Sequence, residues 1–130
     1  MELNVDQALQ QGVAAHNAGH LKEAEDLYLA VLKSQPRHPD ATHNLGLIAI
    51  SRSKPETALP LFKIATEVNP SIEKFWISYI DALIQERQFE NAKRALRKAQ
   101  KRGVAADKIL ALRKQVISVK KGNISIQTPS

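Results

Sequence analysis

A repeat with a period of 34 residues constrains this chain more than any other feature. Ala24, Ala58 and Ala92 lie 34 residues apart, and a large apolar residue follows each of them four positions later. These apolar residues are Tyr28, Phe62 and Leu96. The same period separates two further pairs, Gly12 with Gly46 and Pro36 with Pro70. Because several independent positions agree on one period, we predict a repeat protein in which each unit packs against its neighbours.

Each period has room for a pair of helices. A residue four positions after another lies on the same helical face, one turn on. Proline cannot continue a helix, so Pro36 and Pro70 end two of the units, whereas Gly19 and residues 51–55 separate the two helices inside a unit. Only six residues are aromatic, which favours helices packed through small and medium side chains over a β-sandwich. The predicted helices span residues 4–17, 21–34, 39–51, 55–68, 72–86 and 89–102.

A seventh helix is predicted over residues 105–118. Ile109, Leu112 and Val116 recur there at helical spacing and can cover the third repeat. The side chains expected to remain outside are Lys108, Arg113 and Lys114. Since repeat arrays expose an apolar face at each end, this helix is expected to serve as the cap.

These positions resemble the tetratricopeptide repeat family, over the windows 5–38, 39–72 and 73–106. The second window carries the most family residues: Leu45, Gly46, Ala58, Phe62, Ala65 and Pro70. The third window departs most, with Ile80 in place of the glycine and Val104 in place of the proline. The resemblance implies an all-α, right-handed α-solenoid of three helix pairs plus a capping helix. The expected domain is residues 1–119, followed by a flexible tail or linker at 120–130.

The resemblance also implies a binding groove. In this family the first helices of successive repeats line the concave side of the array. The corresponding residues here are Asp6, Leu9, Gln10, Val13, Asn17, Asp40, His43, Asn44, Leu47, Lys74, Ile77, Ser78, Asp81 and Gln85. Amides, carboxylates and exposed apolar side chains together suit an extended or helical peptide, so we expect a protein or peptide partner. The alternative, that these are only the solvated faces of three helices, stays open.

One family specialisation can be compared residue by residue. Members that bind the C-terminal carboxylate of chaperones use two lysines, two asparagines and an arginine in the groove. Asn44 and Lys74 match this set, whereas Leu9, Val13 and Ser78 stand at the other three positions. Most of the charge that would bind a carboxylate is therefore missing, which argues against this class of partner.

A second resemblance concerns residues 69–83 and 99–103. They are similar to bacterial repeat segments that stand N-terminal to methyltransferase, glycosyltransferase or sulfotransferase domains. This implies an alternative function, as the non-catalytic, substrate-selecting region of a larger group-transfer enzyme. The interpretation that we favour for Phe75, Trp76 and Tyr79 in this segment is core and inter-repeat packing.

Charge is distributed unevenly along the chain. Residues 1–86 carry seven Lys/Arg and eleven Asp/Glu (net −4), and residues 87–130 carry twelve and two (net +10), which together give +6. The predicted basic surface consists of Lys93, Arg94, Arg97, Lys98, Lys101 and Arg102. Such a run can attract nucleic acid, anionic lipid or an acidic protein. Because no aromatic residues are interleaved for base stacking, we favour a solvated face, then an acidic protein partner, over nucleic acid.

Few residues suit catalysis. Without cysteine there is no disulfide, thiolate zinc site or cysteine nucleophile. His16 and His20 have the spacing of two metal ligands, but Gly19 lies between them and no acidic ligand pattern follows. No phosphate-binding loop or nucleophile elbow is present. We therefore predict a protein that is not an enzyme and needs no cofactor, metal or small-molecule substrate.

The sequence also bears on location. No window approaches the roughly 20 apolar residues that span a bilayer, and the N-terminus lacks the basic region of a secretory signal. We expect a cytoplasmic protein without a membrane partner. Asn123-Ile124-Ser125 fits a glycosylation acceptor, yet it lacks that secretory route. The oligomeric state stays open.

Overall fold

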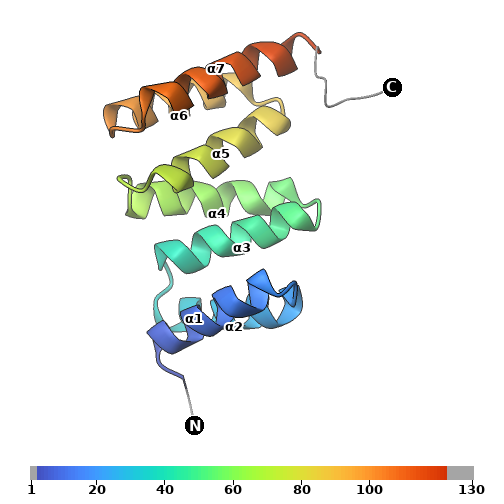
Figure 1. Cartoon of the computed structure of the whole chain (residues 1–130), viewed down its shortest axis with the longest axis vertical. Helices are drawn as coiled ribbons and strands as arrows, with labels where there is room; N and C mark the ends of the chain where they lie inside the picture. Colours follow the sequence, from blue (N-terminus) through green and yellow to red (C-terminus); the bar gives the residue numbers. More distant parts are fainter. Residues whose placement is uncertain (1–2, 123–130) are drawn as a thin grey trace. The chain divides into compact units, whose positions relative to one another are not determined.

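The structure is a computed structural model that describes residues 3–122 (Figure 1). Over these residues the chain is all α-helical, with seven helices and no strand. The helices are α1 (Val5–Asn17), α2 (Leu21–Ser34), α3 (Pro39–Ser51), α4 (Pro55–Val68), α5 (Glu73–Gln85), α6 (Phe89–Lys101) and α7 (Ala106–Lys120). Each begins and ends within two residues of its predicted bounds, so the all-α class and the count of three pairs plus a seventh helix are confirmed. Residues 123–130, with most of the predicted tail and the glycosylation signal at Asn123, lie outside the described residues.

The helices fall into two compact units, of which the first ends at Asn69 and the second begins at Pro70. In unit 1, α1 pairs with α2, α3 pairs with α4, and α2 packs against α3. In unit 2, α5 pairs with α6, and α7 packs against both of them. Each unit therefore has its own helix pairing and its own apolar interior.

Close backbone approach explains the two repeated glycines in unit 1. A Cβ atom added at Gly12 would lie 2.7 Å from Cε1 of Tyr28, and one at Gly46 would lie 2.4 Å from Cε1 of Phe62. Both rings are fully buried, so each glycine makes room for the aromatic side chain of the paired helix. In unit 2 the glycine is replaced by the larger Ile80 and the aromatic residue by the smaller Leu96, and both side chains are buried.

A left-handed residue ends the first helix of every pair. Gly19, Ser53 and Arg87 have φ of 83°, 58° and 59°, and they are 34 residues apart. The amide of the next residue then donates back across the turn, as from Lys54 N to Ala49 O at 2.8 Å. This bond satisfies a carbonyl that the helix end would leave without a donor, so the backbone turn repeats even where the residue type does not.

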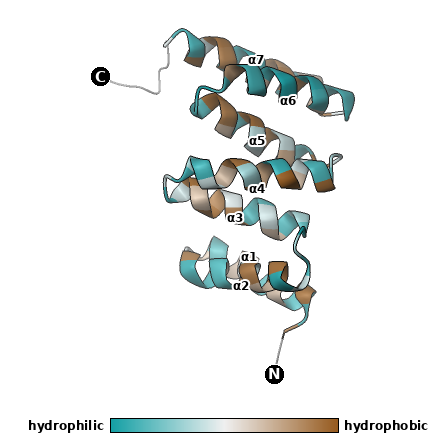
Figure 2. Cartoon of the chain, turned by 180° about the vertical axis from the view of Figure 1, so that it is seen from behind, coloured by the Kyte–Doolittle hydropathy of each residue, from teal (hydrophilic) through white to brown (hydrophobic). Residues whose placement is uncertain are grey.

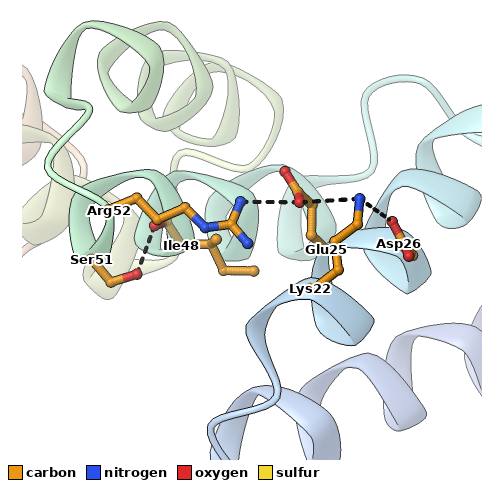
Figure 3. Close-up of polar contacts among 6 residues, drawn as sticks. All are labelled: Lys22, Glu25, Asp26, Ile48, Ser51 and Arg52. Atoms are coloured by element: carbon orange, nitrogen blue, oxygen red, sulfur yellow. Dashed lines mark hydrogen bonds and ion pairs between the residues drawn. The ribbon is translucent and has the colours of Figure 1, made fainter.

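Polar contacts at the surface join helices within unit 1. Figure 3 shows Glu25 of α2 between two cations, with its Oε1 3.0 Å from Arg52 Nη1 and 3.9 Å from Lys22 Nζ. Lys22 also lies 3.2 Å from Asp26, and the Ser51 hydroxyl donates to the Ile48 carbonyl at 2.7 Å. Such exposed pairs contribute only about 0–1 kcal/mol each, so they align α2 and α3 more than they stabilise them.

Candidate protein-interaction surfaces

On α1 the predicted groove residues lie on an accessible face. Asp6, Gln10, Val13 and Asn17 are exposed, and Leu9 is half-buried against the core of unit 1. Val13 is 38% exposed, which is high for a valine beside a packed helix pair. This face therefore presents an apolar side chain flanked by two amides and a carboxylate.

On α3 the predicted residues behave differently, because α3 packs against both α2 and α4. Asp40, Asn44 and Leu47 are half-buried. His43 is only 3% exposed, and its ring centroid lies 5.4 Å from that of Phe62. The side chain of His43 therefore belongs to the interior of unit 1 and does not lie on the accessible face that the sequence predicted for it.

A polar cluster around Tyr28 connects three helices of unit 1. The Tyr28 hydroxyl lies 3.1 Å from His16 Nδ1 of α1 and is hydrogen-bonded to the side chain of Asn44 of α3. Burial raises the pKa of Tyr28 above its usual 10.0, and the hydrogen bond with Asn44 opposes that shift in part. The hydroxyl of the buried Tyr28 therefore fixes the orientation of the Asn44 side chain.

The contact between His16 and Tyr28 was not predicted from the sequence. A signal was available, because Tyr28 stands where the second repeat has Phe62, and a buried tyrosine hydroxyl needs a hydrogen-bonding partner.

On α5, which belongs to unit 2, Lys74, Asp81 and Gln85 are exposed, and Ile77 and Ser78 are half-buried. The Asp81 carboxylate accepts a hydrogen bond of 2.8 Å from Gln115 Nε2 of α7. Part of the predicted α5 set is therefore engaged with the seventh helix.

The aromatic residues of α5 also have partners within unit 2. Phe75 and Trp76 are buried, and the indole Nε1 of Trp76 donates to the Pro70 carbonyl at 2.8 Å. These contacts agree with the packing role that we favoured for Phe75 and Trp76, and Tyr79 is half-buried.

The predicted basic surface is accessible along α6, which Figure 2 shows as predominantly hydrophilic. Arg94, Arg97, Lys98, Lys101 and Arg102 are exposed, and Lys93 is half-buried. Lys93 lies 3.5 Å from Glu90, the only acidic residue of this helix. The face as a whole keeps a strong positive charge.

Between α6 and α7 lies an open cleft of about 470 Å³. Its lining residues are Lys93, Leu96, Arg97, Gln100, Arg113, Val116 and Ile117. Two of the predicted basic residues thus share a hollow with apolar side chains of the capping helix. This hollow was not predicted from the sequence, because the apolar residues of both helices were expected to serve in packing alone.

At one end of unit 2, Glu73 joins α5 to α7. Its carboxylate accepts from the backbone amide of Ala105 at 2.9 Å and from Lys108 Nζ at 2.6 Å. The hydrogen bond from Ala105, and then that from Lys108, lower the pKa of Glu73 below its usual 4.5. The same pairing raises the pKa of Lys108.

Residues 3–122 contain neither a metal-binding cluster nor a membrane-spanning helix. No three His, Asp or Glu side chains there gather closely enough to hold a metal ion. None of the described helices is both long enough and apolar enough to cross a membrane.

The sequence of unit 1 carries a family signature. Residues 9–71, just under half of the chain, match the sequence profile of the tetratricopeptide repeat family. In sequence, these residues therefore resemble tetratricopeptide repeats. Beyond them, the third helix pair continues the same 34-residue period, as Ala92 and Leu96 show. No curated protein sequence matches the chain significantly.

Solved structures of tetratricopeptide repeat domains share this fold. The domain of Sgt2 from Aspergillus fumigatus has a TM-score of 0.76 and 22% identity, over 97% of this chain and 85% of that one. The first domain of Spaghetti (RPAP3), solved with the HSP90 peptide SRMEEVD, has a TM-score of 0.75 and 19% identity, over 89% and 93%. The structure of PilF from Pseudomonas aeruginosa has a TM-score of 0.75 and 20% identity, over 91% of this chain and 54% of that one. At these identities the likeness concerns the fold alone.

Proposed function

We propose that this tetratricopeptide repeat chain is a protein-interaction module that binds a peptide or protein segment along the accessible faces of its first helices. The observation that supports this most is the face of α1, where Val13 is exposed among polar side chains that can pair with a peptide backbone. The α5 residues of unit 2 supply a further set of the same kind. The first domain of RPAP3, which has a similar fold, was solved with a bound peptide, and this supports such a use of the fold.

The chemistry of the face suits a peptide backbone. Gln10 and Asn17 each offer an amide that both donates and accepts, which matches the alternating N–H and C=O groups of a peptide. Val13 and the half-buried Leu9 provide an apolar surface for one ligand side chain. Asn44, held by Tyr28, loses little side-chain freedom when a ligand binds, and this lowers the entropic cost of binding.

The charge of the face indicates which peptides it prefers. On α1 and α3 the predicted groove residues that carry a formal charge are Asp6 and Asp40, and none is a lysine or arginine. We therefore propose a neutral or basic segment in unit 1 rather than a C-terminal carboxylate. This agrees with the comparison of sequences, in which Leu9, Val13 and Ser78 replace three of the five residues that hold a carboxylate in the chaperone-binding members.

The test is affinity capture from a lysate with two matched variants. Val13→Glu places a charge on the proposed face, and Leu29→Glu changes an exposed apolar residue of α2, a second helix. We expect a partner that the wild type and Leu29→Glu retain and Val13→Glu loses, identified by mass spectrometry. Circular dichroism should show unchanged helicity in both variants. Equal capture by all three proteins would place the binding site elsewhere.

The alternative from the sequence, a substrate-selecting region of a group-transfer enzyme, stays a prediction, and so does the cytoplasmic location. Sequencing the gene beyond the codon for Ser130 tests the alternative function. A reading frame that continues into a transferase domain would favour the alternative.

A further inference from the structure

Helix α7 has two apolar faces, and unit 2 covers one of them. Ile109, Leu112, Val116 and Val119 are buried within the unit. Leu110 and Ile117, by contrast, are 53% and 54% exposed. They lie seven residues apart, two turns along the same side of the helix. One side of α7 therefore leaves large apolar side chains in contact with solvent.

The 34-residue period explains what this second face is. The positions equivalent to Leu110 are Ala8, Thr42 and Trp76, and those equivalent to Ile117 are Ala15, Ala49 and Leu83. All six are at most 6% exposed. In α1, α3 and α5 these residues belong to helices that pair with α2, α4 and α6. Helix α7 is thus the first helix of a fourth pair, and within residues 3–122 no second helix follows it.

The cleft between α6 and α7 lies beside this face. Leu96 and Val116 form its buried apolar part, and Ile117 adds an exposed apolar wall. Lys93, Arg97 and Arg113 also line it, and no lining residue is acidic. Lys114 is exposed at the position where the earlier first helices carry Gly12, Gly46 and Ile80. The vacant position of a second helix therefore combines apolar side chains with four basic ones, and Lys114 lies between Leu110 and Ile117.

We propose that this place, formed by the cleft and by Leu110, Lys114 and Ile117, is the docking site for an acidic amphipathic helix of a partner protein. Its apolar stripe would cover Leu110 and Ile117, as α2, α4 and α6 cover the equivalent residues. Its carboxylates would pair with Lys93, Arg97, Arg113 and Lys114. The surface lies within unit 2 and is separate from the proposed peptide-binding face of unit 1.

Charge complementarity selects this occupant over two others. Residues 123–130 contain no Asp or Glu, so they offer no partner for the four cations. A symmetric dimer through α7 would bring Arg113 and Lys114 close to the same residues of the second copy, and like charges at an interface oppose association. An acidic helix from another protein meets both the apolar and the charged requirement.

The experiment uses the whole chain and two fluorescent helical peptides. Both repeat the stripe of Ala92, Leu96 and Ala99 from α6, a 13-residue helix that pairs with α5, where the larger Ile80 stands in place of the glycine. One carries glutamate at the flanking positions and the other lysine. By fluorescence anisotropy we expect the glutamate peptide to bind at least about tenfold more tightly than the lysine peptide, and less tightly as salt rises.

Chain variants locate the site. The double change Leu110→Glu and Ile117→Glu should abolish binding, whereas Leu29→Glu, an exposed apolar residue of α2, should not alter it. Reversing charge with Arg113→Glu and Lys114→Glu should exchange the peptide preference, which loss of folding cannot do. Val13→Glu should leave peptide binding unchanged, so failure of this proposal and failure of the proposed function are distinguishable.

Several outcomes would overturn the proposal. Binding of neither peptide, or equal binding of both, would show that the site does not select an acidic helix. Self-association of the wild type that the Leu110 and Ile117 changes remove, seen by analytical ultracentrifugation, would assign the face to a second copy. Stronger peptide binding after deletion of residues 123–130 would assign it to the chain's own end.

Discussion

The second residue after the first helix of each pair has the same backbone conformation, although three different residue types stand there. Glycine enters the left-handed region without steric cost, whereas an L-residue with a Cβ atom pays about 1–2 kcal/mol there. The backbone of Gly19 is therefore unstrained, whereas Ser53 and Arg87 carry strain that the turn imposes. Arg87 gains something in return, because its Nη1 donates to the Val119 carbonyl near the end of α7 at 2.9 Å.

Ser53→Gly should accordingly stabilise the protein, by about 1 kcal/mol, because it removes this strain from the folded state. The measurement is the free energy of unfolding from urea titrations. Ser51→Gly is the matched control, since Ser51 is the last residue of α3 and a glycine inside a helix costs up to about 1 kcal/mol. Stabilisation by both changes, or by neither, would contradict the strain argument.

At the scale of the helix pair, two solutions to the same packing problem are present in one chain. The α3–α4 pair combines Gly46 with Phe62, and the α5–α6 pair combines Ile80 with Leu96 at the equivalent positions. A small residue opposite a large one fills the same space as two residues of medium size. This explains how the third window keeps its helix pair despite its departure from the family pattern.

Gly46→Ala should destabilise the protein by about 2 kcal/mol, because its Cβ atom would meet the buried ring of Phe62. Adding Phe62→Leu should restore part of this loss, although Phe62→Leu alone costs about 1 kcal/mol by leaving space. A double-mutant cycle measured by chemical unfolding gives the coupling between the two positions. Additive losses would mean that the ring does not limit the approach of the helices.

The contact of α7 with α5 provides an element-scale pH dependence. Because the folded-state pKa of Glu73 is lowered, its contribution to stability is present above its usual pKa of 4.5 and is lost as pH falls further. The raised pKa of Lys108 acts in the opposite sense, so its contribution is present below 10.5 and is lost at higher pH. The pair therefore stabilises the docking of α7 between these limits.

Glu73→Gln should loosen α7 at neutral pH, measured as faster amide hydrogen exchange over residues 106–120. The difference from the wild type should shrink as pH falls from 4.5 through the lowered pKa of Glu73, because the wild-type carboxylate then becomes protonated and, like glutamine, uncharged. Glu90→Gln is the control, since Glu90 is exposed on α6 and pairs only with Lys93 in this helix. A difference that persists unchanged at low pH would show that charge is not the cause.

At the scale of the whole molecule, two kinds of surface lie on two separate units. The face of unit 1 is neutral to acidic with an exposed Val13, whereas the α6–α7 surface of unit 2 is basic with exposed Leu110 and Ile117. Opposite charge patterns attract different partners and repel each other's ligands. Taken together, the two proposals imply that one chain brings two different segments together.

The two surfaces should respond independently to mutation. Val13→Glu should remove lysate capture and leave binding of the acidic peptide intact, and the Leu110→Glu, Ile117→Glu double variant should do the reverse. Both are measured on the full chain, by pull-down and by anisotropy. Loss of both activities in either variant would indicate a single shared site or a folding defect, which circular dichroism separates.

Most of the fold could be predicted from the sequence, because helix bounds depend on local signals such as Pro36, Gly19 and the 34-residue period. Which of the predicted groove residues are accessible could be predicted from the sequence only in part. That Asp6, Gln10 and Val13 are accessible follows from their place on a helix face, since the period assigns each position a side.

Three features came only from the tertiary structure: the burial of His43, the hold of Tyr28 on Asn44, and the uncovered face of α7. Each depends on what a neighbouring helix does. His43 is enclosed because α3 packs on two sides, and Leu110 and Ile117 are exposed because no second helix covers them among the described residues. The period therefore determined which helices form and how they pair, whereas burial and exposure on each face were decided by the packing of helices distant in sequence.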